Sequence, residues 1–430
     1  MSYPYFPFRV ASNGDKDIKV LSPYAGDEIK VNRSGEALLK LCNGSRSMDE
    51  IVTMLCDKFK SKETETRELA ESFVDKFAAR GVVWVKNEKM RWFNAPAPES
   101  IFWEITAECN LKCLHCVVSA DKKQANELST KEALSLIDQW QAMGVGDITF
   151  SGGEPLMRAD FFELARAAKE KGMTVGLATN GLCVTPSIAA ELRELEAGIQ
   201  VSLDGSNEEI YGGFRGNKQA FGQAVKGIDN LVAAGNEVTV GTVISKHNLD
   251  DISKMLDFVE SHGVKYFRLI PFIPFGRGEA NSELELSPLQ VKEVSAYLIE
   301  ERKNRAVEIM TLEFEHTFSD PPANKIDAST PVECGGALHY CTVTPKGEVL
   351  PCHYFEGVDT ENVKAQPFSQ IWRGSRFLNY FRSMKISDIK GYCGECEWLP
   401  VCRSGCKAAN FSTRALFDSN VHCWVVPENV

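Results

Sequence analysis

The sequence predicts an α/β protein with three parts: a small N-terminal unit of short strands and helices, a central domain built on a parallel sheet, and a C-terminal region rich in cysteine. Two observations carry this prediction. Strand and helix patterns alternate through the central residues, and most of the 14 cysteines fall into metal-ligand spacings. In a reducing compartment, tightly spaced cysteines are metal ligands more often than disulfides.

Compartment and partners follow from composition and from the N-terminus. Met1 to Val10 has no basic start, no long apolar run and no small-residue cleavage site. No stretch approaches the roughly 18 apolar residues of a membrane span. The sequence therefore predicts a soluble, cytoplasmic protein that binds no membrane. A net charge of −11 lacks the basic footprint typical of nucleic-acid binding, so we expect no nucleic-acid partner.

The predicted N-terminal domain covers residues 1–94, and a stiff Ala-Pro connector within residues 95–100 follows it. Its middle helix opens with the capping box Ser47-x-x-Glu50. The expected strands are 19–21 and 28–31, the expected helices are 36–42, 48–59 and 66–80, and a final hairpin pairs 82–85 with 91–93. This order is typical of a winged helix, but the charge is not that of a DNA-binding domain.

The central domain, predicted over residues 101–312, repeats a strand followed by a helix. The expected strands are 102–106, 148–150, 174–177, 199–203, 238–243 and 266–270, and the expected helices are 131–143, 160–171, 187–195, 221–234 and 250–262. Such units imply a parallel sheet with crossover helices, open or partly closed into a barrel. Ligands of these sheets bind at the carboxyl ends of the strands.

Cys109, Cys113 and Cys116 form a C-x3-C-x2-C triplet just after the first of these strands. Three thiolates leave one iron of a 4Fe–4S cluster without a protein ligand. An iron with an open coordination position can bind a molecule that reacts there. A structural zinc is the alternative, although zinc sites usually have four protein ligands and no fourth is adjacent here.

The triplet lies within Cys-Asn-Leu-x-Cys-x-His-Cys, which resembles the signature of radical S-adenosylmethionine (SAM) enzymes. The resemblance extends to Gly152-Gly153-Glu154-Pro155 after the second strand, Thr179-Asn180-Gly181 after the third and Ser202-Leu203-Asp204-Gly205 at the end of the fourth. It implies a partial (β/α)6 barrel as the radical SAM core. It also implies that SAM chelates the open iron and is cleaved to a 5′-deoxyadenosyl radical.

The same resemblance implies roles for single residues. The Gly-Gly-Glu segment would hold the methionyl amine, His115 would lie beside the adenine, and Ser202 and Arg215 would contact the SAM carboxylate, which suits a planar guanidinium. Without the family context, Arg215 is a surface charge as readily as a ligand. The expected cofactor-binding residues are His115, Gly152, Gly153, Glu154, Ser202, Asp204 and Arg215.

The C-terminal region, predicted over residues 313–430, contains Cys334, Cys341 and Cys352, then Cys393-x2-Cys396-x5-Cys402-x3-Cys406, and finally Cys423. This series resembles the SPASM extension of radical SAM peptide and protein maturases. That resemblance implies two auxiliary clusters, and hence three 4Fe–4S clusters in all, with every auxiliary ligand slot filled. The first auxiliary cluster would use Cys334, Cys341, Cys352 and Cys406; the second would use Cys393, Cys396, Cys402 and Cys423. A zinc ribbon is the alternative.

His353 follows Cys352 directly, where the anaerobic sulfatase maturases carry an Asp as proton acceptor. The difference argues against sulfatase-maturase activity. His353 is a candidate proton acceptor because its pKa suits proton transfer, and a purely structural role is the alternative. Cys42, Cys56 and Cys183 are expected to be buried thiols without a role.

The segment Val31 to Ile51 resembles the peptide chaperone of pyrroloquinoline-quinone biosynthesis. The resemblance implies that residues 1–94 bind the leader of a ribosomally made precursor peptide, which adds as a strand to the small sheet and packs on the third helix. A generic packing module is the alternative.

Together these features predict a radical SAM maturase of a precursor peptide, reduced by a donor such as flavodoxin or ferredoxin. A thioether crosslink is the leading expected product and a carbon–carbon crosslink comes next. Two alternatives stay open: a radical enzyme acting on a tetrapyrrole or a whole protein, and an iron–sulfur electron carrier or scaffold without enzymatic activity.

Overall fold

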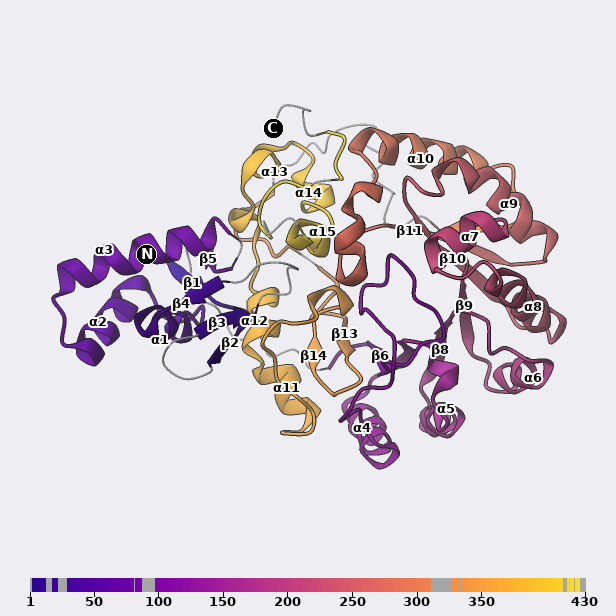
Figure 1. Cartoon of the computed structure of the whole chain (residues 1–430), viewed down its shortest axis with the longest axis horizontal. Coiled ribbons are helices and arrows are strands. Elements are labelled where there is room, and N and C mark those ends of the chain that lie inside the picture. Colours follow the sequence, from indigo (N-terminus) through magenta and orange to yellow (C-terminus); the bar gives the residue numbers. More distant parts are fainter. Residues whose placement is uncertain are drawn as a thin grey trace.

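The computed structural model describes residues 2–12, 18–21, 29–80, 82–86, 97–310, 326–332, 334–412, 416–420 and 422–425. A nine-stranded sheet in the order β12-β11-β10-β9-β8-β7-β6-β13-β14 forms its centre (Figure 1). The six predicted strands are all present, as β6 (Ser100–Thr106), β7 (Asp147–Gly152), β8 (Thr174–Thr179), β9 (Gly198–Ser202), β10 (Val238–Ile244) and β11 (Tyr266–Pro271). Their pairings are parallel, as the alternation of strands and helices predicted.

Three further strands extend this sheet and were not predicted. On one side β12 (Glu308–Met310) pairs with β11. On the other side β13 (Tyr340–Val343) runs parallel to β6, and β14 (Val349–Leu350) completes an antiparallel hairpin. These strands are too short to show an alternating pattern in the sequence. Through β13, the cysteine-rich region continues the sheet of the central domain.

Helices cover one face of the sheet. The five predicted helices are present as α4 (Thr130–Met143), α5 (Phe161–Glu170), α6 (Pro186–Glu194), α8 (Ala220–Ala233) and α9 (Ile252–Ser261). Two more helices were not predicted, namely α7 (Glu208–Arg215) and α10 (Pro288–Glu301). Trp103 of β6 packs edge-on against Trp140 of α4, with ring centroids 4.9 Å apart. No helix in the described ranges has the length and apolarity needed to cross a membrane.

The N-terminal unit has a three-stranded antiparallel sheet and three helices. The sheet order is β2 (Arg9–Ser12), β3 (Ile18–Leu21) and β4 (Ile29–Val31), and the helices are α1 (Arg33–Leu41), α2 (Met48–Phe59) and α3 (Glu63–Ala78). The predicted capping box at Ser47 is present. In the described part, β5 (Trp84–Lys86) pairs with β1 (Tyr3–Tyr5), and the predicted hairpin of 82–85 with 91–93 stays a prediction. Residues 91–93 lie outside the described residues.

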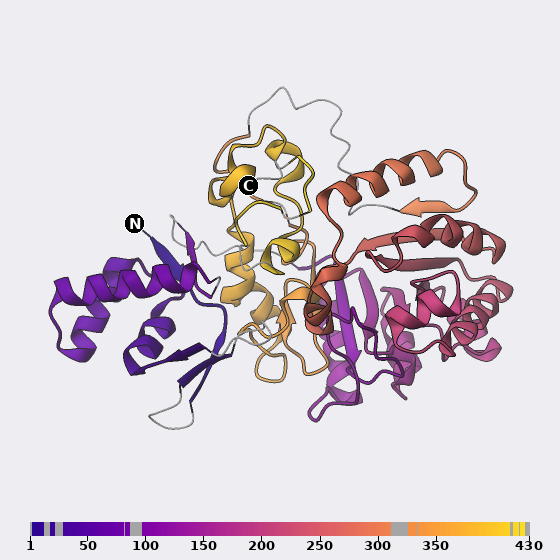
Figure 2. The same cartoon turned by 45° about the horizontal axis from the view of Figure 1, so that its top comes forward.

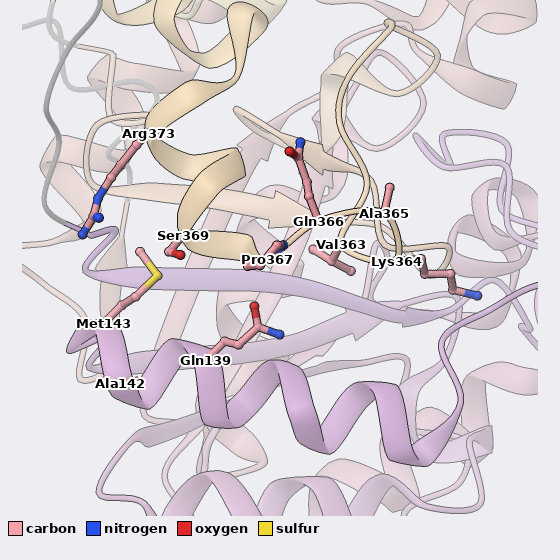
Figure 3. Close-up of a pocket in the computed structure, with 10 residues that line it drawn as sticks. All are labelled: Gln139, Ala142, Met143, Val363, Lys364, Ala365, Gln366, Pro367, Ser369 and Arg373. Carbon is pink, nitrogen blue, oxygen red and sulfur yellow. The ribbon is translucent and has the colours of Figure 1, made fainter.

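Besides β13 and β14, the C-terminal region contains short helices, among them α11 (Phe368–Gly374), α12 (Arg376–Arg382), α13 (Gly391–Glu395), α14 (Leu399–Cys402) and α15 (Lys407–Ser412). Figure 2 shows these helices between the N-terminal unit and the central sheet. Where α11 meets α4, Phe368 N donates to Gln139 Oε1 at 2.8 Å. An open groove of ≈ 720 Å³ runs along this junction, and the side chains of Gln139 and Met143 border it (Figure 3).

Aromatic stacking and one buried ion pair fix the N-terminal unit to the C-terminal region. Tyr5 stacks on Tyr380 of α12 with centroids 4.4 Å apart. Lys86 Nζ lies 3.2 Å from Asp388 and donates to Ser383 Oγ at 3.0 Å, and its side chain is only 3% exposed. The unit is therefore docked on the C-terminal region through β1 and β5.

Replacing Lys86 with Met should destabilise this junction. The substitution leaves the Asp388 carboxylate buried without its cation, a loss worth about 3–5 kcal/mol for a buried pair. Lys40→Met is the matched control, because Lys40 pairs with Glu36 on the surface and such pairs contribute about 0.3–0.5 kcal/mol. Urea denaturation of the two variants measures the difference, and equal effects would contradict the predicted role of the buried pair.

Candidate functional site

A cavity of ≈ 1180 Å³ lies against the face of the sheet opposite the helices. Side chains from the strands line one part of it, including Phe102, Thr149, Gln200, Ser202 and Arg268. The C-terminal region supplies another part, namely Cys334, Tyr340, Cys352, His353, Tyr354, Cys402, Cys406 and Lys407. The cavity thus joins the inner face of the sheet to the predicted auxiliary cluster ligands.

The loop that carries Cys109, Cys113 and Cys116 follows β6 and is held by Arg277. Its Nε donates to Cys113 O at 2.8 Å, its Nη1 donates to Ala120 O at 2.7 Å, and its backbone N donates to Cys116 O at 3.1 Å. Neighbouring Gly276 has φ +56°, and a Cβ there would lie 2.1 Å from Val117 O. Arg277 therefore fixes the cluster loop through its backbone carbonyls and not through its thiols.

The three thiols lie near one another. Burial raises the pKa of Cys113 to about 11, whereas the nearby Arg215 cation lowers it and the charges of Cys116 and Cys109 raise it. Among the described residues, no group of three or more His, Cys, Asp or Glu side chains is arranged to hold a single metal ion. In a 4Fe–4S cluster each thiolate binds a different iron, so these sulfurs do not need to converge on one point.

The Gly152-Gly153-Glu154-Pro155 segment packs directly against the cluster loop. Gly153 N donates to Thr106 O and Glu154 N donates to Glu108 O, both at 2.7 Å. A Cβ on Gly153 would lie 2.1 Å from Glu108 O, and one on Gly152 would lie 2.3 Å from Thr106 O. Gly152 also has φ +130°, which disfavours any other residue. The two glycines therefore set the spacing between the predicted SAM-binding segment and the predicted cluster ligands.

Glu154 joins two strand ends. Its fully buried carboxylate accepts hydrogen bonds from Thr179 Oγ1 at 2.7 Å and from Asn180 N at 2.8 Å. Burial raises the pKa of Glu154, and these hydrogen bonds lower it. Asn180 Nδ2 in turn donates to Asn110 Oδ1 at 2.6 Å. The carboxylate thus ties the Thr179-Asn180-Gly181 segment to the Gly-Gly-Glu-Pro segment, and Asn180 reaches the cluster loop. That Glu154 helps to hold the methionyl amine stays a prediction.

Asp204, Arg215 and His115 form a buried network beside Cys113. Arg215 Nε lies 2.7 Å from Asp204 Oδ2, and Arg215 Nη1 lies 3.9 Å from Cys113 Sγ. Arg215 is only 6% exposed, so it is not a surface charge. The predicted contacts of Arg215 and Ser202 with the SAM carboxylate stay predictions.

His115 Nε2 lies 3.3 Å from Asp204 Oδ2 in this network, and the imidazole stacks on Phe214 with centroids 4.1 Å apart. Burial lowers the pKa of His115 to about 4, so the imidazole is neutral at pH 7. Its Nδ1 is buried and has no hydrogen-bond partner among the described residues. A polar ligand at this position, such as the adenine predicted from the sequence, would satisfy that atom, so the residues present fit SAM.

The C-terminal cysteines form two groups. Burial raises the pKa of Cys352, and the nearby charges of Cys334 and Cys406 raise it further. Burial likewise raises the pKa of Cys402 to about 11, and the charges that raise it further come from Cys393, Cys396 and Cys423. The second group is the set predicted for the second auxiliary cluster.

Cys341 does not join the first group. It lies on β13 in register with Ile101 of β6, and successive side chains of a strand point to opposite faces. Its neighbour Tyr340 lines the cavity, so Cys341 faces the helix-covered side, where it is fully buried. Burial raises its pKa, and the charged group acting on it is Arg382. The structure therefore brings together three of the four thiols predicted for the first auxiliary cluster.

His353 lines the cavity and follows Cys352 at the start of a short 3-10 helix (His353–Phe355). Its ring lies 5.5 Å from Phe102, between centroids. Burial, reinforced by the Arg268 cation, lowers the pKa of His353 to about 4. The imidazole is therefore neutral at pH 7, and it is a weaker base than the pKa assumed from the sequence implied.

The sequence did not single out several residues that shape this site. No recognised motif contains Arg277, Phe214 or Lys407. Each of these residues lies against segments that are distant from it in the chain. Gly276 was the one local sign in the sequence that Arg277 lies at a close contact. A glycine inside a loop often marks a place where another backbone segment approaches closely.

Comparison with known families gives three matches along the chain. The radical SAM superfamily matches residues 103–259, the iron–sulfur cluster-binding SPASM domain matches residues 334–397, and coenzyme PQQ synthesis protein D (PqqD) matches residues 19–83. These matches follow the order of the motifs described above.

Two similar proteins have curated functions. The AdoMet-dependent heme synthase of Methanosarcina barkeri is 34% identical over 332 residues, which cover 74% of this chain and 93% of that protein. The mycofactocin maturase MftC of Mycobacterium tuberculosis is 32% identical over 327 residues, which cover 74% of this chain and 80% of that protein.

Two solved structures share the fold. Streptococcus suis SuiB bound to S-adenosylmethionine has a TM-score of 0.64 and 16% identity, with 97% of this chain and 98% of that chain covered. The enzyme anSMEcpe with bound AdoMet has a TM-score of 0.60 and 19% identity, with 76% and 94% covered.

The fold and the cysteine triplet together define a radical SAM enzyme, so the alternative of a non-enzymatic electron carrier is set aside. The chain belongs to the radical SAM enzymes that carry a C-terminal SPASM domain, and it has a PqqD-type unit at its N-terminal side. As predicted, its core binds SAM and a 4Fe–4S cluster, and its SPASM domain binds auxiliary iron–sulfur clusters.

Gly153→Ala should remove the SAM-binding cluster, because its Cβ would displace the Glu108 carbonyl and with it the cluster loop. We expect the anaerobically reconstituted variant to lose the iron of one cluster and to form no 5′-deoxyadenosine. Gly222→Ala on α8 is the control, since nothing lies within 4 Å of a Cβ there. Iron analysis and chromatography measure both effects, and full iron with normal SAM cleavage would contradict the packing argument.

Proposed function

We propose that this enzyme modifies a ribosomally made precursor peptide by abstracting a hydrogen atom from one of its residues. The observation that carries the proposal is the PqqD-type unit, which is docked on the SPASM domain through Tyr5 and Lys86. Two comparisons support it: MftC is a maturase, and SuiB has been crystallised with its precursor peptide SuiA. The cavity of ≈ 1180 Å³ has room for a segment of peptide.

The chain's own residues prepare the site for this reaction. With its cluster, bound SAM supplies the hydrogen-abstracting chemistry. Gly152 and Gly153 would hold the SAM amine against the cluster loop, and Arg215, charged and paired with Asp204, would face the carboxylate. Phe102 and Tyr354 give the cavity apolar walls, which exclude water from the reacting carbon.

The expected product is a crosslink, with a thioether ahead of a carbon–carbon bond. After hydrogen abstraction, closing either bond requires the substrate to lose one more electron and a proton. The auxiliary clusters, four of whose eight predicted ligands border the cavity, would take the electron, and His353 would take the proton. An external reductant such as flavodoxin or ferredoxin would reduce the SAM-binding cluster.

Co-expression with a candidate precursor peptide tests the proposal. A short reading frame near the gene, with repeated Cys or aromatic residues, supplies that candidate. Mass spectrometry should show a loss of two hydrogens that depends on Cys109, Cys113 and Cys116. A peptide that binds residues 1–94 but stays unmodified would contradict the proposed reaction. A loss of CO2 from the peptide would support a peptide substrate but contradict the crosslink as the product.

A tetrapyrrole substrate is the second candidate, and the 34% identity to an AdoMet-dependent heme synthase favours it. The PqqD-type unit has no obvious part in that reaction. Anaerobic incubation with iron coproporphyrin III separates the two candidates, because conversion of the tetrapyrrole without any affinity for a leader peptide would favour the second.

The leader peptide should bind along β4 and α3. Among the described strands, in the order β2-β3-β4, β4 is an edge strand, and an edge strand can accept a further strand. Leu69 of α3 is 73% exposed, one helical turn before Phe73, which packs against Gly35 close after β4. Leu69→Asp should therefore weaken leader binding about tenfold or more, because burying a leucine contributes about 1.5–3 kcal/mol.

Leu289→Asp is the control for this substitution, since Leu289 is 55% exposed on α10 in the central domain. Fluorescence anisotropy of a labelled leader measures both affinities. Equal affinity in Leu69→Asp and wild type would place the leader elsewhere.

His353→Ala should slow product formation about 100-fold or more, the usual contribution of a general base. Iron content and SAM cleavage should stay normal, because the rings that His353 contacts among the described residues belong to Phe102 and Tyr354, outside the cluster loop and the Gly-Gly-Glu segment. His353→Asp should recover part of the rate by supplying another base. His339→Ala, which alters a histidine 63% exposed, is the control. An unchanged rate in His353→Ala would show a structural role.

A further inference from the structure

Lys407 is a buried lysine in the SPASM domain. It begins α15 directly after Cys406, and its side chain is 1% exposed. Its Nζ donates to Ser404 O at 3.3 Å, and within the described part of the chain no carboxylate pairs with it. Lysines are almost never fully buried without a charged partner, so the position of Lys407 calls for an anion.

The groups around Lys407 come from both auxiliary cysteine groups. Lys407 borders the same cavity as Cys334, Cys406 and Cys402, and the charges that act on its ammonium are those of Cys334, Cys406, Cys393 and Cys402. Cys334 and Cys406 belong to the first group, and Cys393 and Cys402 belong to the second. The ammonium therefore lies between the two predicted clusters, and the clusters themselves are the anions that compensate it.

We infer that the positive charge of Lys407 raises the reduction potentials of both auxiliary clusters. A cluster held by thiolates is an anion, and one-electron reduction adds a further negative charge. A fixed cation in a site of low dielectric stabilises the reduced form more than the oxidised form. The same cation offsets the repulsion between two anionic clusters, so that reducing one does not oppose reducing the other.

A mediator titration of the full chain, followed by electron paramagnetic resonance, tests this inference. Replacing Cys109, Cys113 and Cys116 with Ala first removes the signal of the SAM-binding cluster. In that background, Lys407→Met should lower the midpoint potentials of both auxiliary clusters at unchanged iron content. We expect the equilibrium constant for one-electron reduction to fall at least about tenfold, which corresponds to 59 mV.

Two further variants make the result decisive. Lys407→Arg keeps the charge and should keep the wild-type potentials, and Lys292→Met removes an exposed lysine of α10 and should change nothing. Unchanged potentials in Lys407→Met would overturn the inference. So would potentials in Lys407→Arg as low as those in Lys407→Met, or a loss of iron in Lys407→Met, which would make the lysine an assembly residue. No peptide enters the titration, so its result is independent of the proposed substrate.

Discussion

Close backbone packing at the carboxyl end of β7 is the contact on which the rest of the site depends. Gly152 and Gly153 lie so near Thr106 and Glu108 that a Cβ on either glycine would overlap a carbonyl oxygen. Two short hydrogen bonds, each of 2.7 Å, hold the segments in that register. The segment predicted to bind the SAM amine and the loop predicted to bind the cluster therefore form one rigid piece of backbone.

Buried polar groups extend this rigid piece to the neighbouring strands. Glu154 ties it to the end of β8 through Thr179 and Asn180, and Asp204 fixes Arg215 and faces His115 at the end of β9. Each carboxylate is fully buried and has partners, as a buried charge requires. Strand ends of a parallel sheet thus supply the site, and charge pairing keeps their side chains in place.

Much of the fold and part of the site could be predicted from the sequence. The strand–helix alternation, the cysteine triplet and the glycine motif are local patterns. The first predicted the six parallel strands that the structure has, and the other two predict where SAM and its cluster bind. For Cys341, a local pattern was not enough to predict where the side chain lies. Its spacing fits a ligand series, but the face of β13 on which a side chain lies depends on register with β6, which no local pattern contains. Arg277 and Lys407 escaped for a similar reason, since their contacts join segments distant in the sequence.

Contacts join the N-terminal unit, the C-terminal region and the cluster loop in one series, and this series constrains how a peptide reaches the cavity. The N-terminal unit contacts α12 through Tyr5, the hairpin of β13 and β14 belongs to the same C-terminal region, and β13 pairs with β6, which leads into the cluster loop. The buried Lys86–Asp388 pair and the stacking of Tyr5 on Tyr380 hold the first of these contacts together. A leader held on the N-terminal unit would therefore lie at a fixed distance from the cluster loop. The choice of the modified residue would then depend on how many peptide residues span that distance, and on the apolar walls that admit only certain side chains.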